Sequence, residues 1–377
     1  MSSPILDCTN FPCRNKKETD ELQSRLDDLL RSDLKGTMFS LLAEYTRILT
    51  DNSQRDRWPK LYGKLDTLFR CGRYEPLDGP MLGVSVCIRD SDYFRDTAKL
   101  FGNERSVIAK LETLATAWNA TFANSSLWTG KTFEPIEPYT LRILLEKRVR
   151  AYKQYDNDTT RIGRNFFRNP ICPNPLETVS LPLLTELWDL HDRPQSITVE
   201  GFHCTITEEN LIKERIVPYQ KTGGYFLATV GTSVVPEVRG KQVYQLNYRW
   251  GALHGKFPMS RLVDELVQIG EGIYLGQLVL ATKNFSVGTL DLPFTGTDPK
   301  HLSLGREYDP FDDREGMLEK IIETFTGDTD EQVDYAYQHN GYFLMMDPAY
   351  AELIFAEDAF PALRPTEGEI AALTLRG

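Results

Sequence analysis

Residues 242–250 alternate between apolar and polar side chains, and this segment constrains the fold more than any other part of the chain. One face of an extended segment would carry Tyr244, Leu246, Tyr248 and Trp250, and the other face Gln245, Asn247 and Arg249. Successive side chains of a strand point to opposite sides of its sheet, so the pattern predicts a strand with one buried face. Such an aromatic face has to pack against another layer or inside a curved sheet.

Further strands are predicted on both sides of this segment. Apolar runs bounded by glycine or proline mark residues 82–88, 126–133, 197–202, 225–231, 273–282 and 342–346. Gly223-Gly224 indicates a turn that leads into 225–231. Pro258 is predicted to open a short helix whose buried stripe is Leu262, Val263, Leu266 and Val267. The strand signal is densest between residues 197 and 282.

The N-terminal part of the chain has helical rather than strand periodicity. Apolar residues recur every three or four positions over residues 22–30 and 38–49, and a third helix is predicted over 58–69 with Gly72 as its cap. Similar patterns predict helices over 107–118, 140–153 and 317–325. The first three helices would form a layer against the sheet.

The chain has 377 residues, more than the roughly 250–300 at which a single core stops growing. We therefore expect three parts: a helical segment over 1–75, a barrel-like ligand domain over 76–290, and a C-terminal extension over 291–377 packing on the barrel. The predicted fold class is α+β, with an antiparallel β-barrel or strongly curved sheet and an N-terminal helical layer.

Composition excludes several classes of partner. With 43 basic and 54 acidic residues the net charge is −11, which argues against binding to nucleic acid. No apolar run reaches the roughly 18 residues of an integral membrane segment. The N-terminus lacks a basic region followed by an apolar stretch, which predicts a cytoplasmic protein whose six scattered cysteines are reduced.

Common catalytic and metal-binding motifs are missing from the sequence. It contains no GxSxG elbow, P-loop, GxGxxG fingerprint or HExxH pair. Its five histidines are not spaced at i,i+2 or i,i+4, and its cysteines do not form close ligand pairs. We therefore predict no metal site, and the sequence leaves any cofactor unknown.

Aromatic residues are the main candidates for ligand binding. Large apolar cavities with a few oriented polar groups are typical of small-molecule sites. The predicted ligand-binding residues are Trp128, Tyr225, Tyr244, Tyr248, Arg249, Trp250, His254, Tyr274 and Tyr342. The alternative is that these aromatic side chains simply fill the core of a sheet, where such residues are common.

The segment Ser126-Leu127-Trp128-Thr129-Gly130-Lys131 resembles the GxWxGK signature of GxWxG-type, lipocalin-like proteins. Residues 257–266 and Tyr274-Leu275-Gly276 resemble a later helix and strand of the same proteins. The resemblance implies a calycin-like barrel, in which this tryptophan packs across one barrel end. Ser126 stands where the signature has its first glycine.

Three functions follow from these observations. The first is binding, or also processing, of a hydrophobic small molecule such as a lipid, terpenoid or tetrapyrrole in a barrel cavity. The second is an enzyme inside the same barrel, with general acid or base groups among Arg249, His254, Asp264 and Glu265. The third is a scaffold or assembly protein with a protein partner on the N-terminal helices.

Overall fold

The computed structural model describes residues 4–88, 127–145, 158–169, 175–192, 207–235, 238, 240–248, 253, 262–283, 335–356, 360 and 363. The predicted helices over 107–118 and 317–325, most of 140–153 and the predicted strand over 197–202 lie outside these residues. Within the described ranges, no helix has the length and apolar character needed to cross a bilayer.

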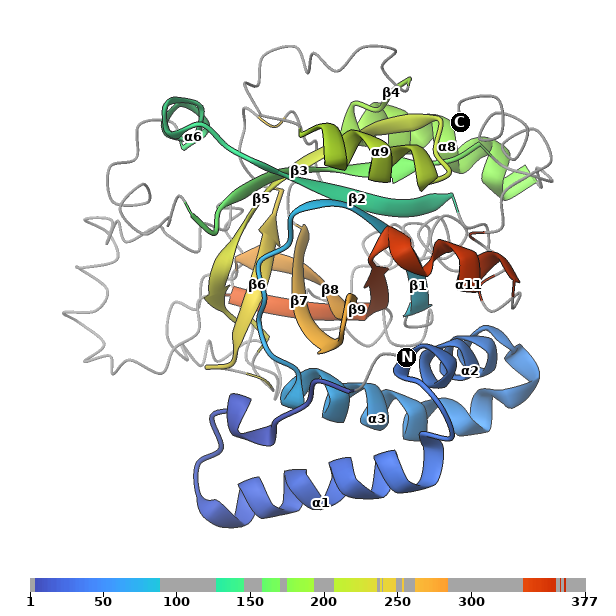
Figure 1. Cartoon of the computed structure of the whole chain (residues 1–377), viewed down its shortest axis with the longest axis vertical. Coiled ribbons are helices and arrows are strands. Elements are labelled where there is room, and N and C mark those ends of the chain that lie inside the picture. Colours follow the sequence, from blue (N-terminus) through green and yellow to red (C-terminus); the bar gives the residue numbers. More distant parts are fainter. Residues whose placement is uncertain are drawn as a thin grey trace, which may run out of the picture.

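Eight antiparallel strands form a closed barrel, which confirms the predicted fold class (Figure 1). Their order around the barrel is β3-β2-β1-β9-β8-β7-β6-β5, and β3 pairs with β5 to close it. A two-residue strand, β4 (His191–Asp192), adds to β5. The barrel strands are β1 (Gly79–Ile88), β2 (Trp128–Pro135), β3 (Arg161–Phe167), β5 (Lys221–Thr232), β6 (Gln242–Asn247), β7 (Leu262–Gly270), β8 (Ile273–Lys283) and β9 (Tyr335–Met346).

The antiparallel order places four connections at the same end of the barrel. These are residues 89–127, 168–220, 248–261 and 284–334, which join β1 to β2, β3 to β5, β6 to β7, and β8 to β9. We call this the loop-rich end. At the other end, β7 and β8 are joined by Glu271 and Gly272 alone.

The prediction of a helix after Pro258 is wrong, because residues 262–270 form the strand β7. Its residues are buried on both faces: Leu262 and Leu266 belong to the apolar cluster inside the barrel, while Val263 and Val267 belong to the cluster outside it. A strand buried on both faces reads as a nearly continuous apolar run. Such a run also contains helical spacings, so periodicity could not separate the two interpretations.

Two other strands differ from the predictions. β3 was not predicted, because its sequence Arg-Ile-Gly-Arg-Asn-Phe-Phe carries polar residues that are buried in the structure. β5 begins at Lys221, so Gly223 and Gly224 lie inside the strand rather than in a turn before it. The register between β3 and β5 shifts at this point, as in a β-bulge.

The N-terminal helices cover one outer side of the barrel, as predicted. They are α1 (Lys16–Asp33), α2 (Met38–Thr50) and α3 (Trp58–Cys71), with the short helix η2 (Asn52–Arg57) before α3. Asn15 and Thr37 cap α1 and α2 by accepting bonds from the backbone of Glu18 and Ser40. The apolar faces of the helices pack against outward-facing residues of β1, β7, β8 and β9.

Gly72 ends α3, as predicted, but for a different reason from the one expected. Its backbone is extended (φ −65°, ψ 161°), so it is not a left-handed cap. A Cβ atom at this position would lie 2.7 Å from Val267 Cγ2. Glycine therefore lets the end of α3 approach the barrel wall.

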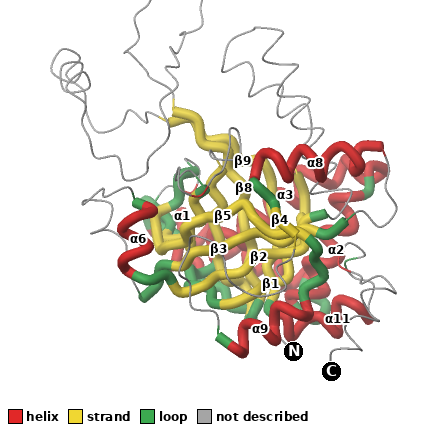
Figure 2. Tube along the Cα trace, turned by 90° about the horizontal axis from the view of Figure 1, so that it is seen from above, coloured by secondary structure: helices red, strands yellow, loops and turns green. Residues whose placement is uncertain are grey.

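Smaller helices lie around the rest of the barrel, which Figure 2 shows as strands surrounded by helices. α6 (Pro138–Leu144) follows β2, and α8 (Pro175–Trp188) and α9 (Glu208–Ile216) lie between β3 and β5 in the chain. η7 (Pro348–Tyr350) and α11 (Ala351–Ala356) follow β9. β9 itself, within the predicted C-terminal extension, is a barrel strand between β1 and β8.

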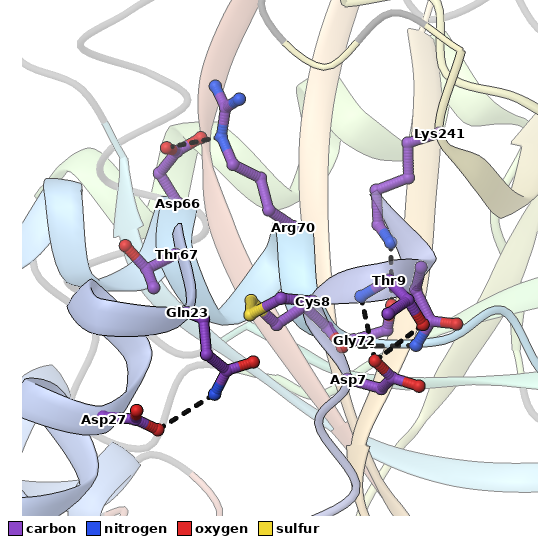
Figure 3. Close-up of a disulfide and its surroundings, with 12 residues drawn as sticks. Asp7, Cys8, Thr9, Gln23, Asp27, Asp66, Thr67, Arg70, Gly72 and Lys241 are labelled. Atoms are coloured by element: carbon purple, nitrogen blue, oxygen red, sulfur yellow. Dashed lines mark hydrogen bonds and ion pairs between the residues drawn. A yellow bond between two sulfur atoms is a disulfide. The ribbon is translucent and has the colours of Figure 1, made fainter. Parts of the chain in front are cut away.

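A disulfide between Cys8 and Cys71 joins the N-terminal arm, which contains η1 (Cys8–Asn10), to the end of α3 (Figure 3). The prediction that all cysteines are reduced is wrong for this pair. The two residues are 63 positions apart, so spacing alone did not pair them. Next to the bridge, Asp7 N donates to Cys71 O at 2.8 Å, and Lys241 Nζ donates to Gly72 O at 2.7 Å.

Three aromatic rings inside the barrel each lie over a glycine of a neighbouring strand. Trp128 covers Gly83, Phe226 covers Gly163, and Phe343 covers Gly276. A Cβ atom at these glycines would lie 2.5, 2.2 and 2.2 Å from the respective ring. The glycines therefore leave the space that the rings occupy in the barrel.

We expect Gly163→Ala to lower the free energy of unfolding by about 2–3 kcal/mol, because the new methyl group overpacks the interior. The clash involves the Phe226 ring and also the backbone oxygen of Thr132, at 2.6 Å. Urea denaturation measures the effect. Gly231→Ala in β5 is the control, since its Cβ would meet nothing closer than 3.7 Å. Equal stability of the two variants would contradict the prediction.

Candidate functional site

Five residues form a polar cluster inside the barrel, near the loop-rich end. We define the polar cluster as Trp128 and Lys131 of β2, Asn165 of β3, Tyr248 directly after β6, and Asp264 of β7. A strict strand would point Trp128 and Lys131 to opposite faces. The register between β2 and β3 shifts between Trp128 and Gly130, and this bulge turns both side chains inward.

Lys131 lies at the centre of the polar cluster. Its Nζ donates to Asn165 Oδ1 at 2.6 Å and to Tyr248 OH at 2.7 Å, and it forms an ion pair with Asp264 Oδ2 at 3.0 Å. The Lys131 and Asp264 side chains are each only 3% exposed. The barrel therefore contains a fully buried ion pair.

Aromatic rings surround the ammonium group. Nζ of Lys131 lies 5.1–5.7 Å from the ring centroids of Trp128, Phe226, Tyr248 and Phe343. At this range the ring faces attract a cation, more strongly when water is excluded. The rings and Asp264 together offset part of the cost of burying the charge.

The remaining members hold one another in place. Trp128 Nε1 donates to Asn165 Oδ1 at 3.1 Å, and Tyr248 OH donates to Asp264 Oδ2 at 2.8 Å. Asn165 Nδ2 donates to the backbone oxygen of Gly224 at 2.8 Å and lies 3.4 Å from Tyr248 OH. Among the described residues, Asp264 Oδ1 has no hydrogen-bond partner.

Burial changes the ionisation of this site. It lowers the pKa of Lys131, an effect that the charge of Asp264 opposes. Burial and the neighbouring Asp264 carboxylate raise the pKa of Tyr248 well above its ordinary value. Tyr248 is therefore a protonated phenol across the physiological pH range, and it acts as a hydrogen-bond donor.

One side of the barrel near this end is covered by α8. Trp188, at the end of this helix, stacks on Tyr248 with ring centroids 5.8 Å apart, and it also contacts Phe167. On the other side, Leu278 of β8 lies directly opposite Asp264 in the β7–β8 register and faces the same way. Leu278 is only partly buried, as are Leu187 of α8 and Val230 of β5 in the same apolar cluster.

The structure brings four of the predicted ligand residues together inside the barrel. Trp128 and Tyr248 belong to the polar cluster, and Tyr244 and Tyr274 belong to the same apolar cluster of the interior, nearer the other end of the barrel. Tyr244 donates its hydroxyl hydrogen to the backbone oxygen of Thr159 at 3.0 Å.

The other predicted residues lie elsewhere. Tyr225 and Tyr342 point outward from β5 and β9, where Tyr225 packs beside α6 and Tyr342 packs among the core of the N-terminal helices. Arg249, Trp250 and His254 lie outside the described residues.

The two predicted acidic groups are separated by the barrel wall. Asp264 faces the interior, whereas the adjacent Glu265 faces outward. Glu265 accepts hydrogen bonds from Ser233 Oγ, Val234 N and Gln277 Nε2 at 2.6–2.7 Å. Burial raises the pKa of Glu265. Glu265 therefore has a structural role: its hydrogen bonds hold residues 233–234, which follow β5, against the outer face of the barrel.

Sequence reasoning missed Lys131 and Asn165 as site residues. Lys131 was visible in the 126–131 segment, but a lysine three positions after an inward tryptophan belongs on the outer face unless a bulge intervenes. Asn165 lies in β3, the strand that was not predicted. No spacing in the sequence indicates that these two residues meet Asp264.

A second group of buried charges lies outside the barrel under α9. Arg164 Nη2 forms an ion pair with Glu214 Oε2 at 2.8 Å, and Tyr219 OH also donates to this carboxylate. Glu134 Oε1 accepts from Thr132 Oγ1 at 2.6 Å. Burial raises the pKa of Glu134 to about 7, although Thr132 and Arg164 oppose this shift.

The raised pKa of Glu134 predicts a loss of stability with rising pH. The folded state binds this proton more tightly than the unfolded state, so its stabilisation is complete below pH about 4.5 and disappears by about pH 7. A rise of the Glu134 pKa from 4.5 to about 7 corresponds to roughly 3 kcal/mol in the free energy of unfolding. Glu134→Gln should therefore be more stable than the parent protein at pH 8, and this advantage should shrink towards pH 4.5. Urea denaturation across this range tests it, with exposed Glu208→Gln as control; a difference independent of pH would contradict the assignment.

Fold and site together define a closed eight-stranded antiparallel barrel with a buried lysine–tyrosine–aspartate cluster near its loop-rich end. No protein-family model, curated protein or solved structure matches the chain. Within the part of the chain that the structure describes, no three histidine, cysteine or acidic side chains are grouped to hold a metal ion.

Proposed function

We propose that the barrel binds a hydrophobic small molecule, such as a lipid, terpenoid or tetrapyrrole, in its interior near the loop-rich end. The observation that carries this proposal is the polar cluster itself. Eight-stranded barrels are of a size that holds either packed side chains or one small ligand. Ligand sites combine an apolar wall with a few polar groups that fix orientation, and they occur at the mouths of β-barrels.

The energetics of the polar cluster favour a role beyond folding. A buried ion pair contributes little net stability, because desolvation offsets the attraction between the charges. Apolar side chains of similar size would fill the barrel equally well. Groups with shifted pKa values gathered near an opening are typical of functional sites.

The position of Trp128 supports the proposed relationship to lipocalin-like proteins. Its ring lies inside the barrel over Gly83 and contacts Phe343, with ring centroids 5.5 Å apart. A tryptophan that packs across one end of the barrel is what the resemblance of residues 126–131 implies.

Native mass spectrometry with an absorbance scan on freshly purified protein tests the proposal. We expect a reproducible extra mass of a few hundred daltons, or an absorption band, that denaturation removes. The variant Lys131→Met/Asp264→Leu, which replaces the charged pair by apolar side chains, should bind this ligand at least tenfold more weakly and no longer retain it through purification. A clean mass, together with no binding of any added apolar compound, would reject the proposal.

An enzyme within the barrel is the second candidate, and Tyr248 is the observation in its favour. Its hydroxyl lies between the Lys131 ammonium and the Asp264 carboxylate, at 2.7 and 2.8 Å. A bound molecule that took the place of Asp264 Oδ2 at this hydroxyl would receive its proton, and Lys131 would then return a proton to the tyrosine. Tyr248→Phe would then abolish turnover of the ligand while leaving its binding in place.

The scaffold hypothesis rests on the N-terminal helices. A cavity of about 780 Å³ lies among α1, α2, η2 and α3, with Asp33, Tyr45 and Lys64 in its wall. The mixed charges of this wall do not define one kind of partner.

The cytoplasmic location also stays a prediction, and the Cys8–Cys71 disulfide favours an oxidising compartment instead.

A further inference from the structure

The hydrogen-bond donors of the polar cluster are all used within the protein. A lysine ammonium group has three N–H donors, and those of Lys131 reach Asn165, Tyr248 and Asp264. The tyrosine hydroxyl has a single donor, which Tyr248 gives to Asp264 Oδ2. A ligand with only acceptor atoms therefore finds no donor among these three side chains.

The indole group of Trp128 and the side-chain amide of Asn165 also use all of their hydrogen-bond donors within the protein. The single N–H of Trp128 donates to Asn165 Oδ1. Of the two N–H groups on Asn165, one donates to Gly224 O and the other points to Tyr248 OH. The five side chains of the polar cluster thus hold their positive and negative charges in balance and keep no donor in reserve.

One acceptor remains. Asp264 Oδ1 is fully buried and has no partner in the described part of the protein, while Oδ2 of the same carboxylate takes part in two interactions. A buried charged acceptor without a hydrogen bond lowers the stability of the folded state. Leu278 lies opposite Asp264 and is only partly buried, so the interior beside this carboxylate is less tightly enclosed than the members of the polar cluster themselves.

We propose that the ligand is a neutral apolar molecule that donates a hydrogen bond from a hydroxyl or N–H group to Asp264 Oδ1. This inference rests on the proposed ligand-binding function and narrows it. Fatty-acid carboxylates are disfavoured, because they would place an acceptor and a second negative charge beside Asp264. A protonated amine would add a third charge to a pair that is already balanced.

Two matched series of compounds test the inference on the unaltered protein. The first is farnesol, farnesyl methyl ether, farnesoic acid and farnesylamine. The second is 2-naphthol, 2-methoxynaphthalene and 2-naphthoate, which have a different shape. Isothermal titration calorimetry at pH 8 should show the alcohol or phenol binding at least tenfold more tightly than its ether, as expected for a hydrogen bond to a charged acceptor. The carboxylate should bind no more tightly than the ether.

The outcomes separate this inference from the proposed function. If the ether binds as tightly as the alcohol, or if the acid or the amine binds most tightly, a ligand site exists. The proposal that the ligand donates a hydrogen bond to Asp264 Oδ1 is then overturned. If no member of either series binds and native mass spectrometry finds no ligand, the proposed function fails and the inference fails with it.

Substitution of Asp264 locates the effect. Asp264→Leu should reduce the preference for alcohol over ether to less than threefold. If this variant does not fold, Lys131→Met/Asp264→Leu replaces it, with the same expectation. Glu265→Gln is the matched control, because Glu265 is the next residue of the same strand, is also buried, and faces outward. A preference that persists without Asp264, or that disappears in Glu265→Gln, would place the acceptor elsewhere.

Discussion

Removal of either member of the Lys131–Asp264 pair is expected to lower the free energy of unfolding by about 3–5 kcal/mol, whereas removal of both costs less than removal of either one. Lys131→Met leaves a buried carboxylate without its cation, and Asp264→Leu leaves a buried ammonium without its anion. In the double variant both charges are absent. Urea denaturation of the four proteins forms a double-mutant cycle that measures the coupling.

The double variant also separates stability from function. If it folds like the parent protein but binds the ligand at least tenfold more weakly, the polar cluster exists for recognition. Additive losses, with the double variant weaker than both single variants, would instead mean that Lys131 and Asp264 do not interact as an ion pair. Lys64→Met is the control, because Lys64 forms an ion pair with Asp33 in the helical layer, where both side chains keep part of their surface in solvent. Its loss of stability should be smaller than that of Lys131→Met.

Deletion of residues 1–72 is expected to abolish the cooperative unfolding transition. The deletion removes α1, α2 and α3 and leaves a wide apolar surface on the outer wall of the barrel, including Val84, Val263, Val267, Ile269 and Leu275. Burial of one such side chain contributes about 1.5–3 kcal/mol, so several together exceed the stability of an ordinary domain. Circular dichroism and thermal melting measure the outcome.

A milder change in the same helices provides the control for this deletion. Lys17→Ala on α1 removes an exposed i,i+4 pair with Glu21 and should leave stability within about 0.5 kcal/mol of the parent. If the protein without residues 1–72 keeps a folded barrel and loses only a binding partner, the result supports the scaffold hypothesis. The helices would then be an accessory layer outside the core. Aggregation or loss of the transition would show that the helices belong to the core.

The sequence was sufficient for the parts of the fold that carry apolar residues on a single face, including β6, whose polar face is also buried. The three N-terminal helices and the strand 242–250 each have one apolar side, so their periodicity distinguished helix from strand. β7 failed this test because both of its faces carry apolar side chains, one inside the barrel and one under the helices. The error arose from the surroundings of the strand, which a local pattern does not contain.

The site was only partly predictable for a similar reason. Trp128, Tyr244, Tyr248 and Tyr274 were selected as large aromatic residues on strands, and the barrel brings them together. Lys131 and Asn165 were not, because a bulge in one strand and a polar sequence in another decide where they point. Bulges are set by strand pairing between distant segments, so a single strand read alone does not reveal them.

The position of β9 has a consequence for how the protein is made. β9 lies between β1 and β8, and Leu82 pairs with Met346 across most of the length of the chain. During synthesis, β1 and β8 leave the ribosome well before β9, so both keep an unpaired edge until Met346 has emerged. Unpaired edges and late long-range pairing expose a nascent chain to aggregation. Barrel closure is therefore a late event in biosynthesis, and ribosome-bound chains that stop before Tyr335 should be more sensitive to protease, and more dependent on chaperones, than the complete protein.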